Sequence, residues 1–249
     1  MRFLVILALL PAVLLTVYIY KKDRIEREPV RLIVRLLALG AFSCIPAAAM
    51  EYGIGAVIDN SGIRNPYFLV FLQSFAVAAL CEELVKFFFL RRKTWRNAAF
   101  DYQFDGIVFG VSVSLGFAAL ENVLYVLQSG MSTALLRAVT SVPGHAIFGV
   151  FMGYFYGYAK RAEVTGSASE ARDYLALSVL VPILLHGVYD FIAFSMQISE
   201  LWIIPFFLYV ALLYFIGLKR VNRSASEDRR IVDAAPQTDN VWQQFNRWQ

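Results

Sequence analysis

The chain has 249 residues, of which 59% are hydrophobic and 17% are charged. Soluble domains have about 45–50% apolar and about 25% charged residues, so this composition excludes an ordinary soluble, disordered or collagen-like protein. The net charge of +4 could indicate a nucleic-acid partner, but the positions of the basic residues explain it without one. Cys44 and Cys81 lie in apolar runs without a metal-ligand or disulfide spacing, and we interpret both as small buried residues.

Seven segments are long and apolar enough to cross a bilayer, which needs about 20 such residues. In chain order they are 3–20, 32–50, 66–90, 104–128, 132–159, 174–196 and 201–218. The first could be a signal peptide, but no small-residue cleavage site precedes Lys21, so we expect a retained helix. The sequence thus predicts an all-α, polytopic transmembrane helix bundle over residues 1–218, a multi-pass protein of the cell membrane.

The positions of the lysines and arginines predict the orientation of this bundle. Eighteen of the 23 lie in segments 21–31, 91–103, 160–173 and 219–249, which alternate spans place on one side. Only Arg2, Arg64 and Arg137 fall on the other side. Because basic loops stay in the cytoplasm, we expect the N-terminus outside and the C-terminus inside. The longest outside loop is 53–65, so any chemistry takes place in or at the bilayer.

The C-terminal segment 219–249 is polar, and we expect it to form a cytoplasmic tail. Its last ten residues, 240–249, place Trp242, Phe245 and Trp248 at a spacing typical of a helix. This pattern fits either a helix lying on the membrane surface or a loose tail. We expect the loose tail.

Seven ionisable residues lie inside the middle spans. They are Glu82, Glu83, Lys86, Glu121, His145, His186 and Asp190, and they include both histidines of the chain. Each ionisable group costs about 2.5–3.5 kcal/mol to insert into a membrane. Such residues are therefore functional candidates that face the interior of the bundle.

Helical spacing pairs several of these residues. Glu82 and Glu83 precede Lys86 by four and three residues, so both carboxylates can reach the lysine along one side of a helix. One lysine cannot neutralise two carboxylates, which leaves a group able to accept and return a proton. His186 and Asp190 have the same four-residue spacing, so the aspartate can fix the imidazole tautomer and leave the other nitrogen free.

The remaining two candidates have no partner nearby in the sequence. Glu121, followed by Asn122, has no local cation, so its partner must come from another helix. His145 follows Pro143 and Gly144, and a proline inside a span permits a kink. Beyond it, glycines at every fourth position (Gly149, Gly153 and Gly157) form a stripe that allows close helix packing.

These motifs, in this order on successive helices, resemble those of the PrsW family of intramembrane proteases. The motifs are EExxK (Glu82, Glu83 and Lys86), FxxxEN (Phe117, Glu121 and Asn122), a separate His145, and HxxxD (His186 and Asp190). That family is similar to the CAAX-processing and bacteriocin-processing membrane endopeptidases. The resemblance covers roughly residues 66–196.

The resemblance implies proteolysis near the membrane. PrsW-like enzymes cut a membrane-spanning anti-sigma factor on its extracytoplasmic side during regulated proteolysis. By analogy with the CAAX enzymes, the first glutamate activates water and the histidines assist. The implied partners are a membrane-protein substrate and the lipid bilayer, with no nucleic acid.

Our primary hypothesis is therefore a glutamate endopeptidase without a cofactor. Glu82 or Glu83 takes a proton from water, and His145 or Glu121 holds that water. His186, oriented by Asp190, stabilises the oxyanion or protonates the leaving amine, while Lys86 sets the carboxylate charge and Asn122 supports the site.

Three alternatives use the same residues. In a zinc protease, His145, His186 and Glu121 would form a His₂Glu ligand set, although the chain has no HExxH motif. A proton- or ion-coupled transporter would relay charge through these side chains, but no inverted repeat is evident. A non-catalytic membrane scaffold would keep them for assembly, and the intact pair of glutamates argues for an enzyme instead.

Overall fold

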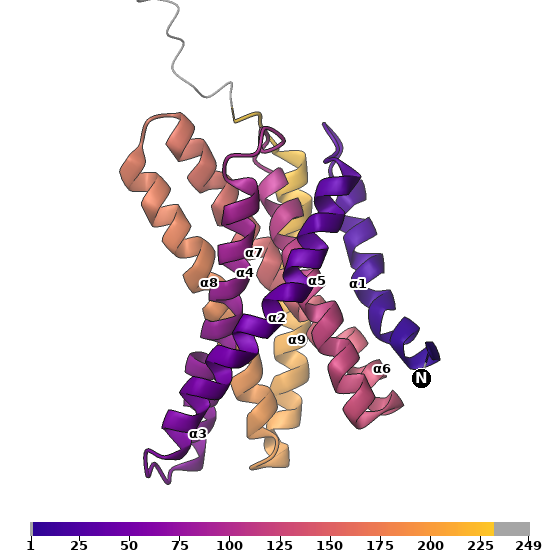
Figure 1. Ribbon diagram of the computed structural model, residues 1–249, viewed down its shortest axis with the longest axis vertical. Helices are drawn as coiled ribbons and strands as arrows, with labels where there is room; N and C mark the ends of the chain where they lie inside the picture. Colours follow the sequence, from indigo (N-terminus) through magenta and orange to yellow (C-terminus); the bar gives the residue numbers. More distant parts are fainter. Residues whose placement is uncertain (1, 232–249) are drawn as a thin grey trace, which may run out of the picture.

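The computed structural model describes residues 2–231, which form a bundle of long helices with no β-sheet in that range (Figure 1). The elements are α1 (Arg2–Lys22), α2 (Val30–Asp59), α3 (Pro66–Leu72), the π-helix η1 (Gln73–Ala79), α4 (Leu80–Thr94), α5 (Asp105–Ser129), α6 (Met131–Val139), α7 (Ser141–Val164), α8 (Ala168–Ser195), the 3₁₀ helix η2 (Glu200–Trp202) and α9 (Ile203–Ser226). Seven helical segments are long and apolar enough to cross a membrane, which confirms the predicted multi-pass bundle.

Helices α1, α4 and α9 carry basic residues in their last turns, and these three helices end at the same end of the bundle, at the top of Figure 1. Lys21 and Lys22 end α1, Arg91 and Arg92 lie in the last turn of α4, and Arg223 lies in the last turn of α9. We call this the basic end. The positive-inside rule places it in the cytoplasm, and this orientation stays a prediction.

Two predicted boundaries differ from the structure. Helix α2 continues to Asp59, so the connection to α3 is only residues 60–65 rather than 53–65. The predicted span 132–159 corresponds to the segment Met131–Val164, but the backbone breaks at Thr140 (φ −125°, ψ −70°), which divides this span into α6 and α7. Pro143 lies in the first turn of α7, where its missing N–H has no helical partner to lose, so it starts the helix instead of kinking it.

The start of the predicted tail continues the fold. Helix α9 extends to Ser226, and the chain then returns to the bundle, where the backbone N–H of Ile231 donates to the carbonyl of Asp101 at 2.7 Å. The side chain of Ile231 is buried. The aromatic residues Trp242, Phe245 and Trp248 lie outside the described residues.

Glycines bring the two central helices, α5 and α7, into backbone contact. A Cβ added to Gly110 of α5 would lie 2.6 Å from the carbonyl oxygen of Gly149 and 2.9 Å from the nitrogen of Gly153 on α7. Gly106 faces Gly157 in the same way. Only glycine permits this approach. This contact confirms the close packing predicted from the glycine stripe. It also brings together two ionisable side chains, Glu121 of α5 and His145 of α7.

Candidate active site

The site begins where the π-helix η1 passes into α4. The backbone N–H of Leu80 donates to the carbonyl of Phe75, the wider turn that π-helices make and that often occurs near functional sites. The ring of Phe75 packs against Gly187 of α8, where a Cβ would meet the ring. This contact draws α8 toward α4 at the residue that follows His186.

Lys86 connects the two adjacent glutamates on the inner face of α4. Its Nζ lies 2.9 Å from Oε2 of Glu82 and 2.8 Å from Oε1 of Glu83, which confirms the pairing predicted from their spacing. The ammonium also lies 4.0 Å from the centre of the Phe117 ring on α5. Lys86 is fully buried, so these contacts replace its hydration.

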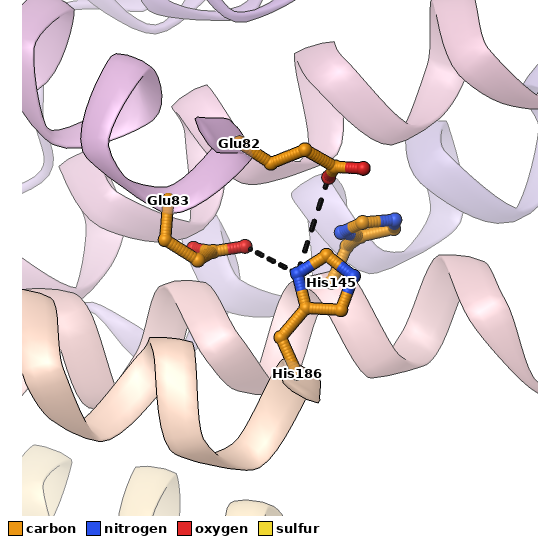
Figure 2. A group of neighbouring side chains, drawn as sticks. All are labelled: Glu82, Glu83, His145 and His186. Atoms are coloured by element: carbon orange, nitrogen blue, oxygen red, sulfur yellow. Dashed lines mark hydrogen bonds and ion pairs between the residues drawn. The ribbon is translucent and has the colours of Figure 1, made fainter. Parts of the chain in front are cut away.

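His186 of α8 lies between two carboxylates. Its Nδ1 is 3.0 Å from Oε1 of Glu83 and its Nε2 is 3.2 Å from Oδ2 of Asp190. Figure 2 shows both glutamates reaching the same ring nitrogen, with Glu82 the more distant at 4.0 Å. We expected one nitrogen to be free, but both are engaged. Both can donate only when the imidazole is protonated.

His145 of α7 connects α4 with α5. Its Nδ1 lies 3.2 Å from Nζ of Lys86, and its Nε2 lies 3.0 Å from Oε2 of Glu121. Because an ammonium can only donate, Nδ1 is the acceptor, and the ring proton is on Nε2 and is donated to Glu121. The ring centres of His145 and His186 are 5.1 Å apart. The histidines from two helices therefore share one site.

Arg137 of α6 is a residue of this site that the sequence did not point to. Its Nη2 donates to Oε2 of Glu121 at 2.6 Å, and its Nε donates to Oδ1 of Asn122 at 3.0 Å. Asn122 in turn donates to the carbonyl of Ala8 on α1 at 2.8 Å. By its position in the sequence, Arg137 was counted only among the three basic residues on the outer side. The available signal was Glu121, which required a cation from another helix.

A cavity of about 500 Å³ joins these side chains. Of the predicted site residues, it is lined by Glu82, Glu121, His145, His186 and Asp190. Glu83, Lys86 and Asn122 are fully buried behind this wall. Cys44 also lines the cavity and is half-buried, whereas Cys81 is buried, and both are free thiols. Five of the eight predicted site residues thus line one cavity inside the bundle.

The comparisons with known proteins agree with this geometry. The family model described as "PrsW family intramembrane metalloprotease" matches residues 28–218. The chain belongs to the PrsW family. It is 38% identical to Protease PrsW of Oceanobacillus iheyensis over 86% of this chain and 92% of that protein, and 37% identical to Protease PrsW of Bacillus subtilis over 87% and 93%. No solved structure matches it at a significant level.

Membership of the PrsW family makes this chain an intramembrane protease. The matching region, 28–218, is wider than the motif region 66–196, because it includes α2 and most of α9. Helix α2 lines the cavity with Cys44, Ala48 and Glu51. The part of the cavity wall that α2 forms therefore also lies within the PrsW region.

The PrsW description as a metalloprotease can be tested against the donor atoms of this site. Glu82, Glu83, His145 and His186 each offer one ligand atom, and these atoms lie within 4.8 Å of one another. Carboxylate oxygen and imidazole nitrogen are accepted zinc ligands, so the donor set fits a metal. This group includes Glu82 and Glu83, whereas the expected ligand Glu121 lies outside it and contacts His145 at 3.0 Å.

Lys86 is the feature of this PrsW site that competes with a metal. Its ammonium makes contacts of 2.8–3.2 Å with Glu82, Glu83 and His145, three of the four candidate ligands. Two cations cannot share these donors in a buried site without strong repulsion. A metal would therefore hold the same donors only after the ammonium moved away or lost its charge.

Proposed function

We propose that this PrsW protease is a glutamate endopeptidase that cleaves a membrane-anchored protein near its extracytoplasmic face. The observation that carries the proposal is the meeting of Glu82, Glu121, His145 and His186, from four helices, around one cavity. Buried carboxylates and imidazoles in reach of one another supply the acid and the base that peptide hydrolysis needs.

Glu82 is the general base in this proposal. It lines the cavity, whereas the side chain of Glu83 has no exposed surface and is enclosed by Lys86 and His186. Glu82 can therefore take the proton of a water molecule that attacks the scissile carbonyl. Glu83 holds Lys86 and His186 in place, so its role is positioning.

The charges of the site support a carboxylate that exchanges a proton. Glu82, Glu83, Glu121 and Asp190 are four acids, and the cations that contact them are Lys86, Arg137 and protonated His186. One negative charge is left without a cation. It falls most naturally on Glu82, which faces the cavity where a water molecule can share its proton.

The histidines supply the remaining roles. His186 donates a proton or a hydrogen bond to the oxyanion or the leaving amine, after exchanging its bond to Glu83 or Asp190 for one to the substrate. His145 and Glu121 hold the attacking water. Arg137 fixes the carboxylate of Glu121.

The position of the cavity along the bundle supports cleavage at the extracytoplasmic side. Glu51, Gln73, Arg137 and Met196 line the cavity, and they lie in the half of the bundle away from the basic end. The positive-inside rule makes that half extracytoplasmic. The proposed substrate class is a single-span membrane protein cut outside the membrane, with an anti-sigma factor as the specific expectation.

The test compares membrane proteomes of cells that express the wild type, Glu82→Gln or Glu83→Gln. New N-termini or C-termini beside the transmembrane segment of a membrane protein should appear only with the wild type. Glu170→Gln, an exposed carboxylate in the first turn of α8, is the matched control and should keep these cuts. Full cleavage by both Glu82→Gln and Glu83→Gln contradicts the proposal.

A zinc-dependent form is the second candidate, since the four clustered donor atoms favour it. When bound there, zinc would polarise the scissile carbonyl and lower the pKa of its water. Glu82, Glu83, His145 and His186 would hold the ion, and Lys86 would have to leave its present place. Metal analysis of the purified protein and chelator sensitivity of cleavage decide between the forms. Stoichiometric zinc together with chelator-sensitive cleavage would favour the second.

A further inference from the structure

One face of α4 points away from the catalytic cavity and is divided into an apolar half and a basic half. Its residues follow the helical repeat, and they are Leu84, Phe87, Phe88, Arg91, Arg92, Trp95 and Arg96. Together they line a groove of about 730 Å³. Residues spaced in this way lie on one side of a helix, so the groove is a continuous strip along α4. We call it the α4 groove.

The α4 groove is an outer surface of the bundle. Leu84 is 37% exposed and Phe88 is 57% exposed, whereas Glu83, Lys86 and Leu90 on the opposite side of α4 are fully buried. All the residues that line the groove come from α4 and its C-terminal turn. In a bilayer, the exposed apolar half must therefore be in contact with lipid chains.

The three arginines of the α4 groove are available to a ligand. Arg91, Arg92 and Arg96 are exposed, and none of them forms an ion pair with a carboxylate among residues 2–231. Trp95 is tied on its other side, where its indole N–H donates to Glu163 of α7 at 3.0 Å. This hydrogen bond therefore holds the Trp95 side chain in place beside the three arginines.

The length of the α4 groove matches one leaflet. Leu84 and Arg96 are twelve residues apart, or about 18 Å along a helix. Half of the hydrocarbon core is about 15 Å thick, so the apolar end reaches toward the bilayer centre when the arginines lie at the headgroups. Trp95, among the arginines, then lies at the interfacial depth that tryptophan prefers.

We propose that the α4 groove binds an anionic phospholipid of the leaflet at the basic end. The guanidinium groups of Arg91, Arg92 and Arg96 bind the phosphate and the negative headgroup, because a planar guanidinium donates two parallel hydrogen bonds to such oxygens. An acyl chain lies along Phe87, Phe88 and Leu84. A free phosphate ion would use only the arginine half, whereas the lipid uses both halves. The proposal does not depend on the proteolytic mechanism.

The test uses the full chain reconstituted in vesicles of phosphatidylcholine and phosphatidylglycerol at three to one, followed by native mass spectrometry of the released protein. The wild type should retain one phosphatidylglycerol molecule, enriched at least about fivefold over its share of the bilayer, since each arginine near an anionic surface contributes about that factor. The variant with Arg91→Gln, Arg92→Gln and Arg96→Gln should lose this enrichment.

The matched control removes three exposed arginines elsewhere at the same end, by Arg24→Gln, Arg31→Gln and Arg172→Gln. It has the same net charge as the groove variant and should keep the bound lipid. Equal enrichment in the groove variant and the wild type, or equal loss in both triple variants, overturns the proposal. Retention of phosphatidylcholine to the same extent also overturns it.

A second measurement separates lipid binding from misfolding. Thermal unfolding of the single variant Arg92→Gln is followed in vesicles with and without phosphatidylglycerol, with inorganic phosphate as a third condition. Phosphatidylglycerol should raise the Tm of the wild type more than the Tm of Arg92→Gln. In vesicles without phosphatidylglycerol the two proteins should have the same Tm. A Tm rise by phosphate alone, equal to that by lipid, contradicts the lipid assignment.

Discussion

Arg137 donates to the carboxylate of Glu121 at 2.6 Å, although a helix end and a helix start separate the two residues. The same oxygen, Oε2, accepts from Nε2 of His145 at 3.0 Å. The chain leaves α5 after Ser129 and turns back through the short α6, and this turn brings Arg137 alongside α5. Arg137 therefore fixes the carboxylate that fixes the His145 ring.

Substitution of Arg137 is expected to impair cleavage through this positioning. Arg137→Ala should lower kcat/KM for the substrate that the proteome comparison identifies by roughly ten- to a hundredfold, the range for lost supporting contacts in active sites. Added guanidinium should restore part of the rate, because the cavity beside Arg137 admits a small cation. Arg64→Ala, at an exposed arginine in the connection between α2 and α3, is the control. It should leave kcat/KM unchanged, and added guanidinium should have no effect on it.

If Arg137 has a purely structural role, a different result is expected. Guanidinium would then restore no activity, and the loss would follow the drop in Tm. Arg137→Lys keeps the charge but not the two parallel donors that reach Glu121 and Asn122. It should fold like the wild type and still cleave more slowly.

The part of the site that sequence could predict is the part held within single helices. Lys86 contacts Glu82 and Glu83, and His186 contacts Asp190, at the four- and three-residue spacings that a helix brings together. The seven spans were readable for the same reason, because a bilayer demands about 20 apolar residues in a row. Both the contacts within one helix and the positions of the spans follow from the pattern of residues along a short stretch of the sequence.

Contacts between helices could not be predicted in this way. Glu121 lies on α5 and Arg137 on α6, and the apolar patterns of two spans give no sign of which of their polar residues meet. The π-helix η1 turns the start of α4 so that Glu82 faces the cavity and Glu83 does not. One extra residue in a helical turn rotates the residues that follow by about 100°. The apolar pattern of a span does not show such a rotation, so it cannot predict which of the two glutamates faces the cavity.

Loss of Lys86 is expected to destabilise the fold more than loss of any exposed lysine. Lys86→Met leaves Glu82 and Glu83 buried without their cation, and breaking a buried pair typically costs about 3–5 kcal/mol. Adding Glu82→Gln and Glu83→Gln to Lys86→Met should recover part of that stability. Thermal unfolding in detergent micelles measures both effects, with Lys21→Met as the exposed control. Equal Tm values for Lys86→Met and Lys21→Met contradict the buried ion-pair account.

The backbone contact between α5 and α7 predicts a sharp difference between two glycines. A Cβ on Gly153 would collide with the Gly106 carbonyl on α5, whereas a Cβ on Gly55 of α2 has no neighbour within 4 Å. Gly153→Ala should therefore cost about 1–3 kcal/mol, the usual range for overpacking. Gly55→Ala should be neutral or stabilise by up to about 1 kcal/mol, because alanine is the better helix former. If the two variants unfold at one temperature, the close approach is wrong.

The connection between α1 and α2 gives the protein a pH dependence with a definite sign. Glu28 lies there, outside the spans, and is only 4% exposed, with its carboxyl within hydrogen-bond reach of Asp105. Burial, with the neighbouring acids Asp23, Asp101 and Glu26, raises the pKa of Glu28 from 4.5 to about 8. The folded chain then binds a proton that the unfolded chain releases, so stability falls as pH rises from about 4.5 to about 8.

Tm in detergent micelles at pH 6 and at pH 9 checks this dependence, and the lower value is expected at pH 9. Glu28→Gln, which is neutral at every pH, should reduce the difference between the two values. Glu170→Gln changes an exposed carboxyl in the first turn of α8, away from this connection, and should leave the difference as it is in the wild type. A Tm that rises with pH in the wild type, or an unchanged slope in Glu28→Gln, would show that Glu28 is ionised in the folded chain. Burial would then have to be offset by a cation at this place.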